Sequence, residues 1–173
     1  MRNLITTIGA ITSLALMPAS YGQDKKGDTV KDAKGKTLEE QMIGYWAPDP
    51  EAMMAQFMKE IGDDPSAALM IPMIKAMLEN MAVEVTKDKV TIYAMGDAQT
   101  STYTVTKTDP KTSTVTMTVK DDDGESEGTA VIKGKKLTLS KDEDDLALNS
   151  ISKAEFEKRK TAAKQPPVIP GLE

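Results

Sequence analysis

Apolar and polar residues alternate along the chain from about residue 82 to residue 148. Val83 and Val85 alternate with polar residues, and Val90 and Ile92 do the same beyond a turn at Lys87-Asp88. Successive side chains of a strand point to opposite faces, so this period of two predicts strands with one apolar and one polar face. The pattern recurs in further short segments whose apolar positions are Tyr103 and Val105; Val115, Met117 and Val119; Ala130 and Ile132; Leu137 and Leu139; and Leu146 and Leu148.

Threonines mark the opposite face of the two longest segments. Thr100, Thr102, Thr104, Thr106 and Thr108 are expected to share one face, and Thr112, Thr114, Thr116 and Thr118 one face of the next strand. Turn residues separate the segments at Asp109-Pro110, 121–124, Gly134-Lys135 and 142–145. We therefore predict a mainly β protein with some helix: an antiparallel up-and-down meander of about seven strands plus a short one at Trp46, about the number that closes a small barrel.

A period of 3.6 replaces the period of two between residues 50 and 80. Asp49 before Pro50 is a favourable N-cap and first helical position, and Gly62 is a favourable stop. Asp64-Pro65 repeats this start, and the second helix is expected to run to about Asn80, with a kink or break near Ile71 caused by Pro72. These patterns predict a helical hairpin at 50–80, inserted after the first strand.

Four regions follow from the pattern. Residues 1–22 combine Arg2, a short apolar stretch and small residues at the end, which predicts a secretory signal cleaved after about Gly22. Residues 23–37 form a charged leader, and 38–153 form the barrel, opened by a capping box at Thr37–Glu40. Residues 154–173 are expected to hold a C-terminal helix, docked by Phe156, and a proline-rich tail. We expect a secreted or periplasmic protein without an integral membrane segment in the mature chain.

Composition excludes several kinds of chemistry. The 173 residues include no cysteine and no histidine, so no disulfide, His-based catalytic triad or ordinary zinc site is expected. The net charge is −5, and no basic face is evident, which disfavours nucleic-acid binding. The Ser-x-x-Lys pattern at 150–153 lacks the companion motifs of acyl-transfer enzymes. We expect no catalytic residues, no cofactor and no enzymatic activity.

Methionines are concentrated in the predicted hairpin. Met54 and Met58 are four residues apart, and the second helix carries a stripe on one face, formed by Met70, Met73, Met77 and Met81. Methionine is a flexible apolar residue that suits a core, an adaptable lid or a docking surface. Its thioether also suits Cu(I), although the chain has no His or Cys to complete such a site. We therefore assign no metal site, and Cu(I) binding through the methionine stripe remains the third alternative for the function.

The sequence resembles the calycin superfamily, which includes lipocalins and fatty-acid-binding proteins. The resemblance covers roughly Leu38 to Lys153 and rests on Gly44-x-Trp46, on the short helical turn before it, and on the helix pair and strand meander after it. It implies a barrel in which Trp46 plugs the closed end and Gly44 allows the backbone to approach it. The helix pair is similar to the lid of fatty-acid-binding proteins. The Arg-x-Tyr pair that holds a carboxylate in those proteins is absent, so no such clamp is implied.

These observations favour binding of a small hydrophobic ligand. We expect the ligand or a partner to contact the hairpin, and the barrel wall to be lined by Tyr103 and Val105; the full set of candidate residues is Met58, Met70, Met73, Met77, Tyr103 and Val105. The alternative is a protein-interaction module with a solid barrel and Met-rich docking helices, because small barrels can be filled by their own side chains. The acidic turn at 121–127 resembles half of a calcium loop, but lacks a recognisable closing bidentate Glu.

Overall fold

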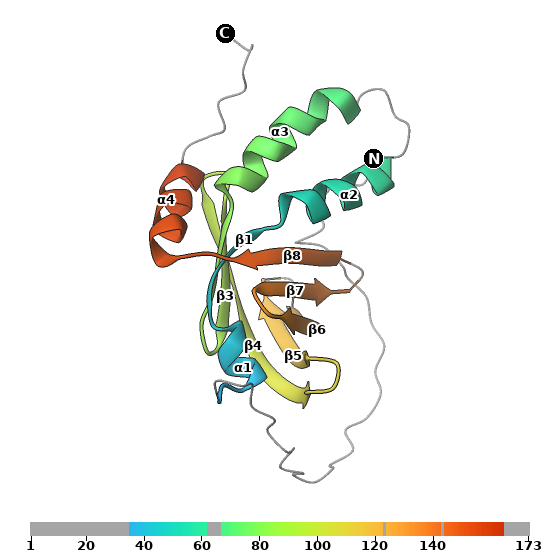
Figure 1. Ribbon diagram of the computed structural model, residues 1–173, viewed down its shortest axis with the longest axis vertical. Coiled ribbons are helices and arrows are strands. Elements are labelled where there is room, and N and C mark those ends of the chain that lie inside the picture. The colour runs from blue at the N-terminus through green and yellow to red at the C-terminus, as the bar shows by residue number, and fades with distance from the viewer. Residues whose placement is uncertain (1–34, 62–66, 123, 143, 165–173) are drawn as a thin grey trace.

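The structure, a computed structural model, describes residues 35–61, 67–122, 124–142 and 144–164. In this part of the chain, eight antiparallel strands follow one another around a closed barrel in which β8 returns to pair with β1 (Figure 1). The predicted meander, the helical hairpin after the first strand and the C-terminal helix are confirmed. The strands are β1 (Gly44–Pro48), β2 (Ala82–Val85), β3 (Lys89–Ala94), β4 (Asp97–Asp109), β5 (Thr114–Asp121), β6 (Gly124–Lys133), β7 (Lys136–Lys141) and β8 (Asp144–Ser150).

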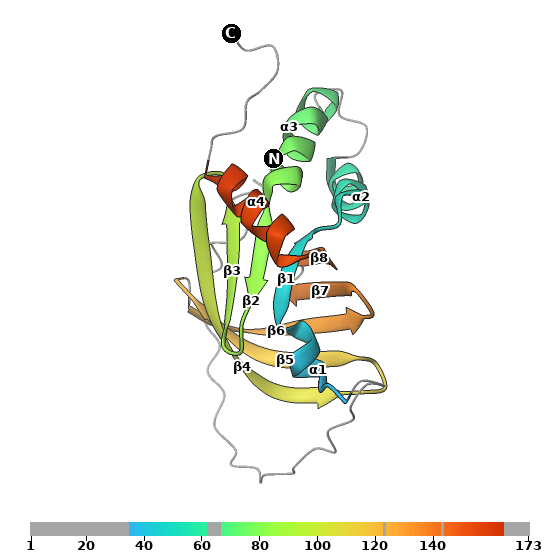
Figure 2. The ribbon, with the colours of Figure 1, turned by 60° about the vertical axis from the view of Figure 1, so that its left-hand side comes forward.

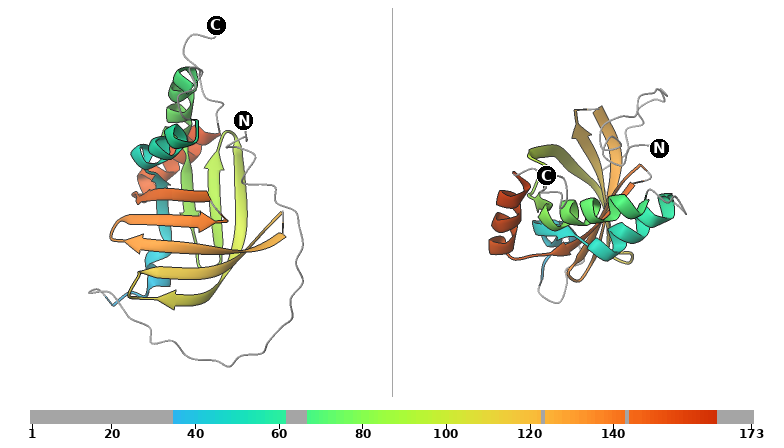
Figure 3. Two further views of the ribbon diagram at one scale, coloured as in Figure 1. Left: turned by 90° about the vertical axis from the view of Figure 1, so that its right-hand side faces the viewer. Right: turned by 90° about the horizontal axis from the view of Figure 1, so that it is seen from above.

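Four helices accompany the barrel, namely α1 (Leu38–Met42), α2 (Pro50–Ile61), α3 (Ala67–Asn80) and α4 (Lys153–Ala163). The helix α1 lies at one end of the barrel, α2 and α3 extend from the other end, and α4 lies on the outside (Figures 1 and 2). Strands β5 to β8 cross β2 and β3 at a steep angle, and the long strand β4 bends from one direction to the other and pairs with β5 (Figure 3). The predicted signal at 1–22, the leader up to residue 34, the helix signals at 62–66 and the tail at 165–173 lie outside the described residues.

Local hydrogen bonds explain where the helices begin. Thr37 Oγ1 accepts from the backbone N–H of Glu40 at 3.1 Å, and Glu40 Oε2 accepts from the backbone N–H of Thr37 at 2.8 Å, which completes the predicted capping box of α1. Asp49 Oδ1 accepts from the backbone N–H of Ala52 at 3.3 Å at the start of α2. Ser152 Oγ accepts from the backbone N–H of Glu155 at 3.2 Å at the start of α4.

Two details differ from the sequence prediction. The break offered as one alternative near Ile71 does not occur: α3 continues from Ala67 to Asn80 with Pro72 inside it, whereas the other alternative, a kink, stays a prediction. A proline removes one backbone donor, but the helix packs against its neighbours on both sides of that point, and packing outweighs one lost hydrogen bond. In β4, Thr108 does not share the face of the earlier threonines. The pairing with β5 shifts between Val105 and Lys107, so Thr108 pairs with the buried Val115.

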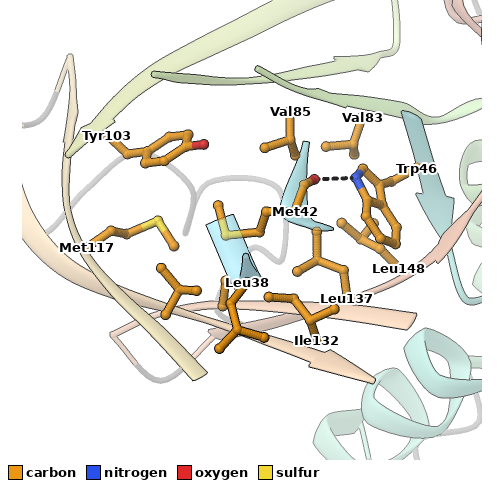
Figure 4. Packing of buried hydrophobic residues seen from close by; sticks show 12 residues of the cluster. Leu38, Met42, Trp46, Val83, Val85, Tyr103, Met117, Ile132, Leu137 and Leu148 are labelled. Atoms are coloured by element: carbon orange, nitrogen blue, oxygen red, sulfur yellow. Dashed lines mark hydrogen bonds between the residues drawn. The ribbon is translucent and has the colours of Figure 1, made fainter. Parts of the chain in front are cut away.

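The barrel has one continuous apolar core (Figure 4). Helix α1 inserts Leu38 and Met42 into it, and Met42 is fully buried. Trp46 is 3% exposed, and its Nε1 donates to the backbone oxygen of Met42 at 2.9 Å. Gly44 adopts a φ of +156°, which a residue with a side chain rarely adopts, and a Cβ there would lie 3.8 Å from Trp46 Nε1. Trp46 and α1 thus close this end of the barrel together.

Helix α4 is held on the outer face of the barrel by aromatic packing. Phe156 is 1% exposed, and its ring centroid lies 4.6 Å from that of Tyr45 and 5.6 Å from that of Tyr93. Arg159 Nη1 donates to the backbone oxygen of Glu79 at 2.8 Å, near the end of α3. The helix therefore connects β1 and β3 with the base of the helical hairpin.

Candidate ligand site in the barrel

The inner wall of the barrel is not uniformly buried. Twelve residues form the buried cluster, whereas six further inward apolar residues pack against it and are only partly buried: Val90, Ile92, Val105, Val119, Leu139 and Leu146. An inward side chain remains partly exposed only where solvent reaches it between the strands and helices. In an up-and-down meander the β5–β6 and β7–β8 turns lie at the end where β1 leads into α2, so Val119, Leu139 and Leu146 lie towards that end.

A charged pair lies on the same wall, one inward position closer to the α2–α3 end than Val119 and Leu139. Asp121 is the next inward position after Val119 on β5, and Lys141 is the next inward position after Leu139 on β7. Lys141 Nζ lies 2.6 Å from Asp121 Oδ2, with side-chain exposures of 33% and 16%. Because β6 separates β5 from β7, the pair spans the inner face of β6.

The inner face of β6 beside this pair carries small residues. The inward positions of β6 facing it are Gly124, Ser126 and Gly128, since they pair with Asp121, Val119 and Met117. A Cβ on Gly128 would lie 3.0 Å from Val119 Cγ2 and 3.2 Å from the backbone oxygen of Ser140, closer than side chains normally approach. The absence of a side chain here is therefore required by the packing of the neighbouring strands.

Ser126 is the polar group at the centre of this inner face. Its Oγ is buried and has no hydrogen-bond partner among the residues that the structure describes. Buried hydroxyl groups are usually hydrogen-bonded, and an unpartnered one costs about 1–3 kcal/mol. The barrel wall therefore combines apolar side chains, one ion pair and one unused hydroxyl at the same end.

The structure does not bring the candidate residues into one site. Tyr103 and Val105 belong to the barrel, where Tyr103 is 6% exposed within the core and Val105 is partly buried. Met58, Met70 and Met73 are exposed on the hairpin, at 44%, 39% and 37%. The hairpin has an apolar cluster of its own around Phe57, Ile74 and Leu78, and Met77 packs against it. The methionine stripe of α3 is therefore divided between solvent and packing, since Met81 is buried.

Tyr103 has its polar end inside the protein. Its hydroxyl donates to the backbone oxygen of Thr86 at 2.6 Å. Burial, reinforced by the negative charges of Asp88 and Glu39, raises the pKa of Tyr103 to about 12. This hydrogen bond fixes Tyr103 of β4 in the wall and connects it to the turn between β2 and β3.

We predict that this tyrosine makes stability decrease in alkali. The folded protein holds the Tyr103 proton more tightly than the unfolded chain, so its contribution is complete below the unfolded pKa of about 10 and is lost as the pH rises through the folded pKa. A shift of this size corresponds to about 2–3 kcal/mol of unfolding free energy. Urea unfolding of the wild type and of Tyr103→Phe, carried out between pH values of about 9 and 12, measures this loss of unfolding free energy.

The Tyr103→Phe variant is expected to lose most of this alkaline decrease. It should also be about 1 kcal/mol less stable near neutrality, because the hydrogen bond to Thr86 is lost. Tyr93→Phe is the matched control, since the Tyr93 hydroxyl is part-buried and its hydrogen bond to Glu84 Oε2 is long, at 3.4 Å. Equal pH slopes in the wild type and in Tyr103→Phe would show that Tyr103 is not the responsible group.

Sequence reasoning missed Lys141, Asp121 and Ser126. The signal was available, because continuing the alternation of β5 and β7 by one step past Val119 and Leu139 places Asp121 and Lys141 on the inner face. From the sequence, Asp121 is placed in the turn at 121–124, and Lys141 and Ser126 receive no role in a site. Their proximity across β6 depends on the barrel and is not visible from the spacing of the residues.

Within the described ranges, no group of three or more His, Cys, Asp or Glu side chains is arranged to hold a metal ion. None of the helices among the described residues has the length and apolar character needed to cross a bilayer.

Comparison of the chain with models of known families, with curated proteins and with solved structures finds no match.

Proposed function

We propose that this protein is an exported, non-enzymatic, lipocalin-like member of the calycin superfamily that binds a small hydrophobic molecule inside its barrel. The observation that carries the proposal is the partly accessible apolar wall at the α2–α3 end, formed by Val119, Leu139 and Leu146. Ligand sites usually combine an apolar lining with a few polar groups that converge on the ligand. The Lys141–Asp121 pair supplies such groups on the same wall.

The order of the elements supports the family part of the proposal. Gly44 and Trp46 are on β1, α1 precedes them, and the α2–α3 hairpin stands between β1 and β2. The absence of His and Cys from the sequence supports a role that does not depend on catalysis. The pattern of residues 1–22 supports export.

Native mass spectrometry of the mature protein, purified from the compartment that holds it, tests the binding role. We expect an adduct of a small organic molecule that organic solvent removes. The emptied protein should then bind an apolar fluorescent dye such as N-phenyl-1-naphthylamine with one dye molecule per chain. A bare mass together with no saturable dye binding would reject the proposal and favour a solid barrel.

Two variants place the dye inside or outside the barrel. Leu146→Trp adds bulk to the inner wall and should weaken dye binding about tenfold or more, because overfilling a packed interior costs about 1–3 kcal/mol. Asp145→Trp is the matched control, since Asp145 is the neighbouring residue on β8, is exposed, and belongs to the face of the strand that points out of the barrel. Equal effects of both variants would place the dye elsewhere than in the barrel.

A protein-interaction module is the second candidate, and the exposure of Met58, Met70 and Met73 favours it. Exposed methionines form adaptable apolar contacts with varied partners. In that case dye uptake should be lost when these three residues are replaced by serine, and unaffected by Leu146→Trp.

A further inference from the structure

The Lys141–Asp121 pair carries information on the chemistry of the ligand, given the binding role proposed above. The pair holds opposite unit charges 2.6 Å apart, and neither side chain is fully buried. A molecule entering from the α2–α3 end therefore meets an ammonium and a carboxylate side by side, with the apolar Val119 and Leu139 one inward position deeper. The wall changes from polar to apolar over a distance that a single amphiphilic molecule can span.

We propose that this ion pair selects a net-uncharged polar head group that both donates and accepts hydrogen bonds, so that the ligand is a neutral amphiphile such as a long-chain alcohol or primary amide. A hydroxyl or amide group can accept a hydrogen bond from Lys141 and donate one to Asp121 at the same time. Its apolar chain would then lie along Val119, Leu139 and Leu146.

A carboxylate fits this pair poorly. To bind Lys141 it would have to approach Asp121, and two carboxylates at such a distance repel each other. Asp144, which pairs with Lys141 in the β7–β8 ladder, adds a further negative charge beside the ammonium. An ammonium head group meets the reverse difficulty, because the Asp121 carboxylate is already bound by Lys141.

Ser126 supports a hydrogen-bonding head group at this position. It lies on β6 opposite Val119, on the face that the ion pair spans, and its Oγ has no partner within the described part of the chain. A head group that draws Lys141 or Asp121 aside would reach this hydroxyl. No atom lies within 4 Å of a Cβ built on Gly124, so there is space for such a movement on that side.

Three ligands of equal chain length test the proposal: dodecanol, dodecanoate and dodecylammonium. Competition against the bound dye at about pH 8 keeps the acid and the amine ionised. We expect the wild type to bind dodecanol about tenfold more tightly than either ion. Equal or tighter binding of dodecanoate would overturn the inference while leaving the carrier function intact.

Removing one charge of the pair should change this preference in a defined direction. Asp121→Asn leaves the ammonium of Lys141 without its carboxylate, so dodecanoate affinity should rise about tenfold relative to dodecanol. Lys141→Met should shift the preference towards dodecylammonium by a similar factor. The matched controls are Asp145→Asn and Lys120→Met, which make the same charge changes at exposed positions on the outward faces of β8 and β5.

The controls should leave the order of the three ligands unchanged. If they shift it as much as the inner variants do, the overall charge of the protein decides the preference, and the inference is wrong. Circular dichroism of each variant shows that it is folded before its affinities are compared. Failure of every variant and of the wild type to bind any of the three ligands or the dye would reject the proposed binding function itself.

Discussion

Replacing Phe156 by alanine is expected to destabilise the protein by about 3–5 kcal/mol, because a fully buried aromatic side chain is lost and a cavity remains. Phe156 is 1% exposed between the rings of Tyr45 and Tyr93. It is also the residue through which α4 is fixed to the outer face of β1 and β3. Urea unfolding followed by circular dichroism measures the change, and the native stability of a domain is typically only about 5–15 kcal/mol.

Two controls separate packing from other effects at this helix. Phe156→Leu retains much of the apolar volume and should cost less than the alanine variant, about 1–2 kcal/mol. Glu157→Ala changes the neighbouring exposed residue and should stay within about 0.5 kcal/mol of the wild type. A loss below about 1 kcal/mol in Phe156→Ala would mean that α4 contributes little to the folded state.

Replacing Trp46 by alanine is expected to cost about 3–5 kcal/mol as well, for a different reason. Trp46 is 3% exposed in the core, next to α1, and its Nε1 donates to the backbone oxygen of Met42. The substitution empties the closed end of the barrel and removes the bond that holds α1 there. Far-UV circular dichroism is the suitable signal, because Trp46 is the only tryptophan in the chain.

Trp46→Phe separates the hydrogen bond from the packing. It keeps an aromatic ring and leaves the Met42 carbonyl without its donor, so a loss of about 1–3 kcal/mol is expected. Tyr45→Phe, on the adjacent position of β1 and the opposite face, should be nearly neutral, within about 0.5 kcal/mol. If Trp46→Phe is as stable as the wild type, the bond to Met42 does not hold α1 in place.

Most of the architecture could be predicted from the sequence because it depends on local patterns. The alternation around Val83 and Val115 fixes which side of each strand is apolar, and a closed meander is the arrangement that buries all of these faces together. The starts of α1 and α2 could also be predicted, because a capping side chain and the backbone donor that it satisfies are only three residues apart.

The features that the sequence did not reveal depend on contacts between distant segments. The shift between Val105 and Lys107 turns Thr108 inward, and nothing in the regular spacing of the threonines signals it. The Lys141–Asp121 pair bridges two strands, β5 and β7, that are not neighbours in the sheet. The continuation of α3 through Pro72 depends on its packing against α2, which outweighs the local preference of proline.

The separation of the methionines from the barrel wall has the same origin. Their spacing predicts one face of α3 but not what covers that face. The hairpin turned out to bury Phe57, Ile74 and Leu78 between its own helices, which leaves Met70 and Met73 in solvent. Their expected contact with a ligand or partner therefore stays a prediction.

The pairing of β1 with β8 has a consequence for how the protein is made. Trp46 pairs with Ser150, so the barrel cannot close until almost all of its sequence has left the ribosome. Contacts between segments so far apart form late and slowly, because a long loop has to be ordered first. A nascent chain with this topology therefore stays open until β8 has been synthesised. The last strand of the barrel therefore sets the earliest moment at which the fold can be completed.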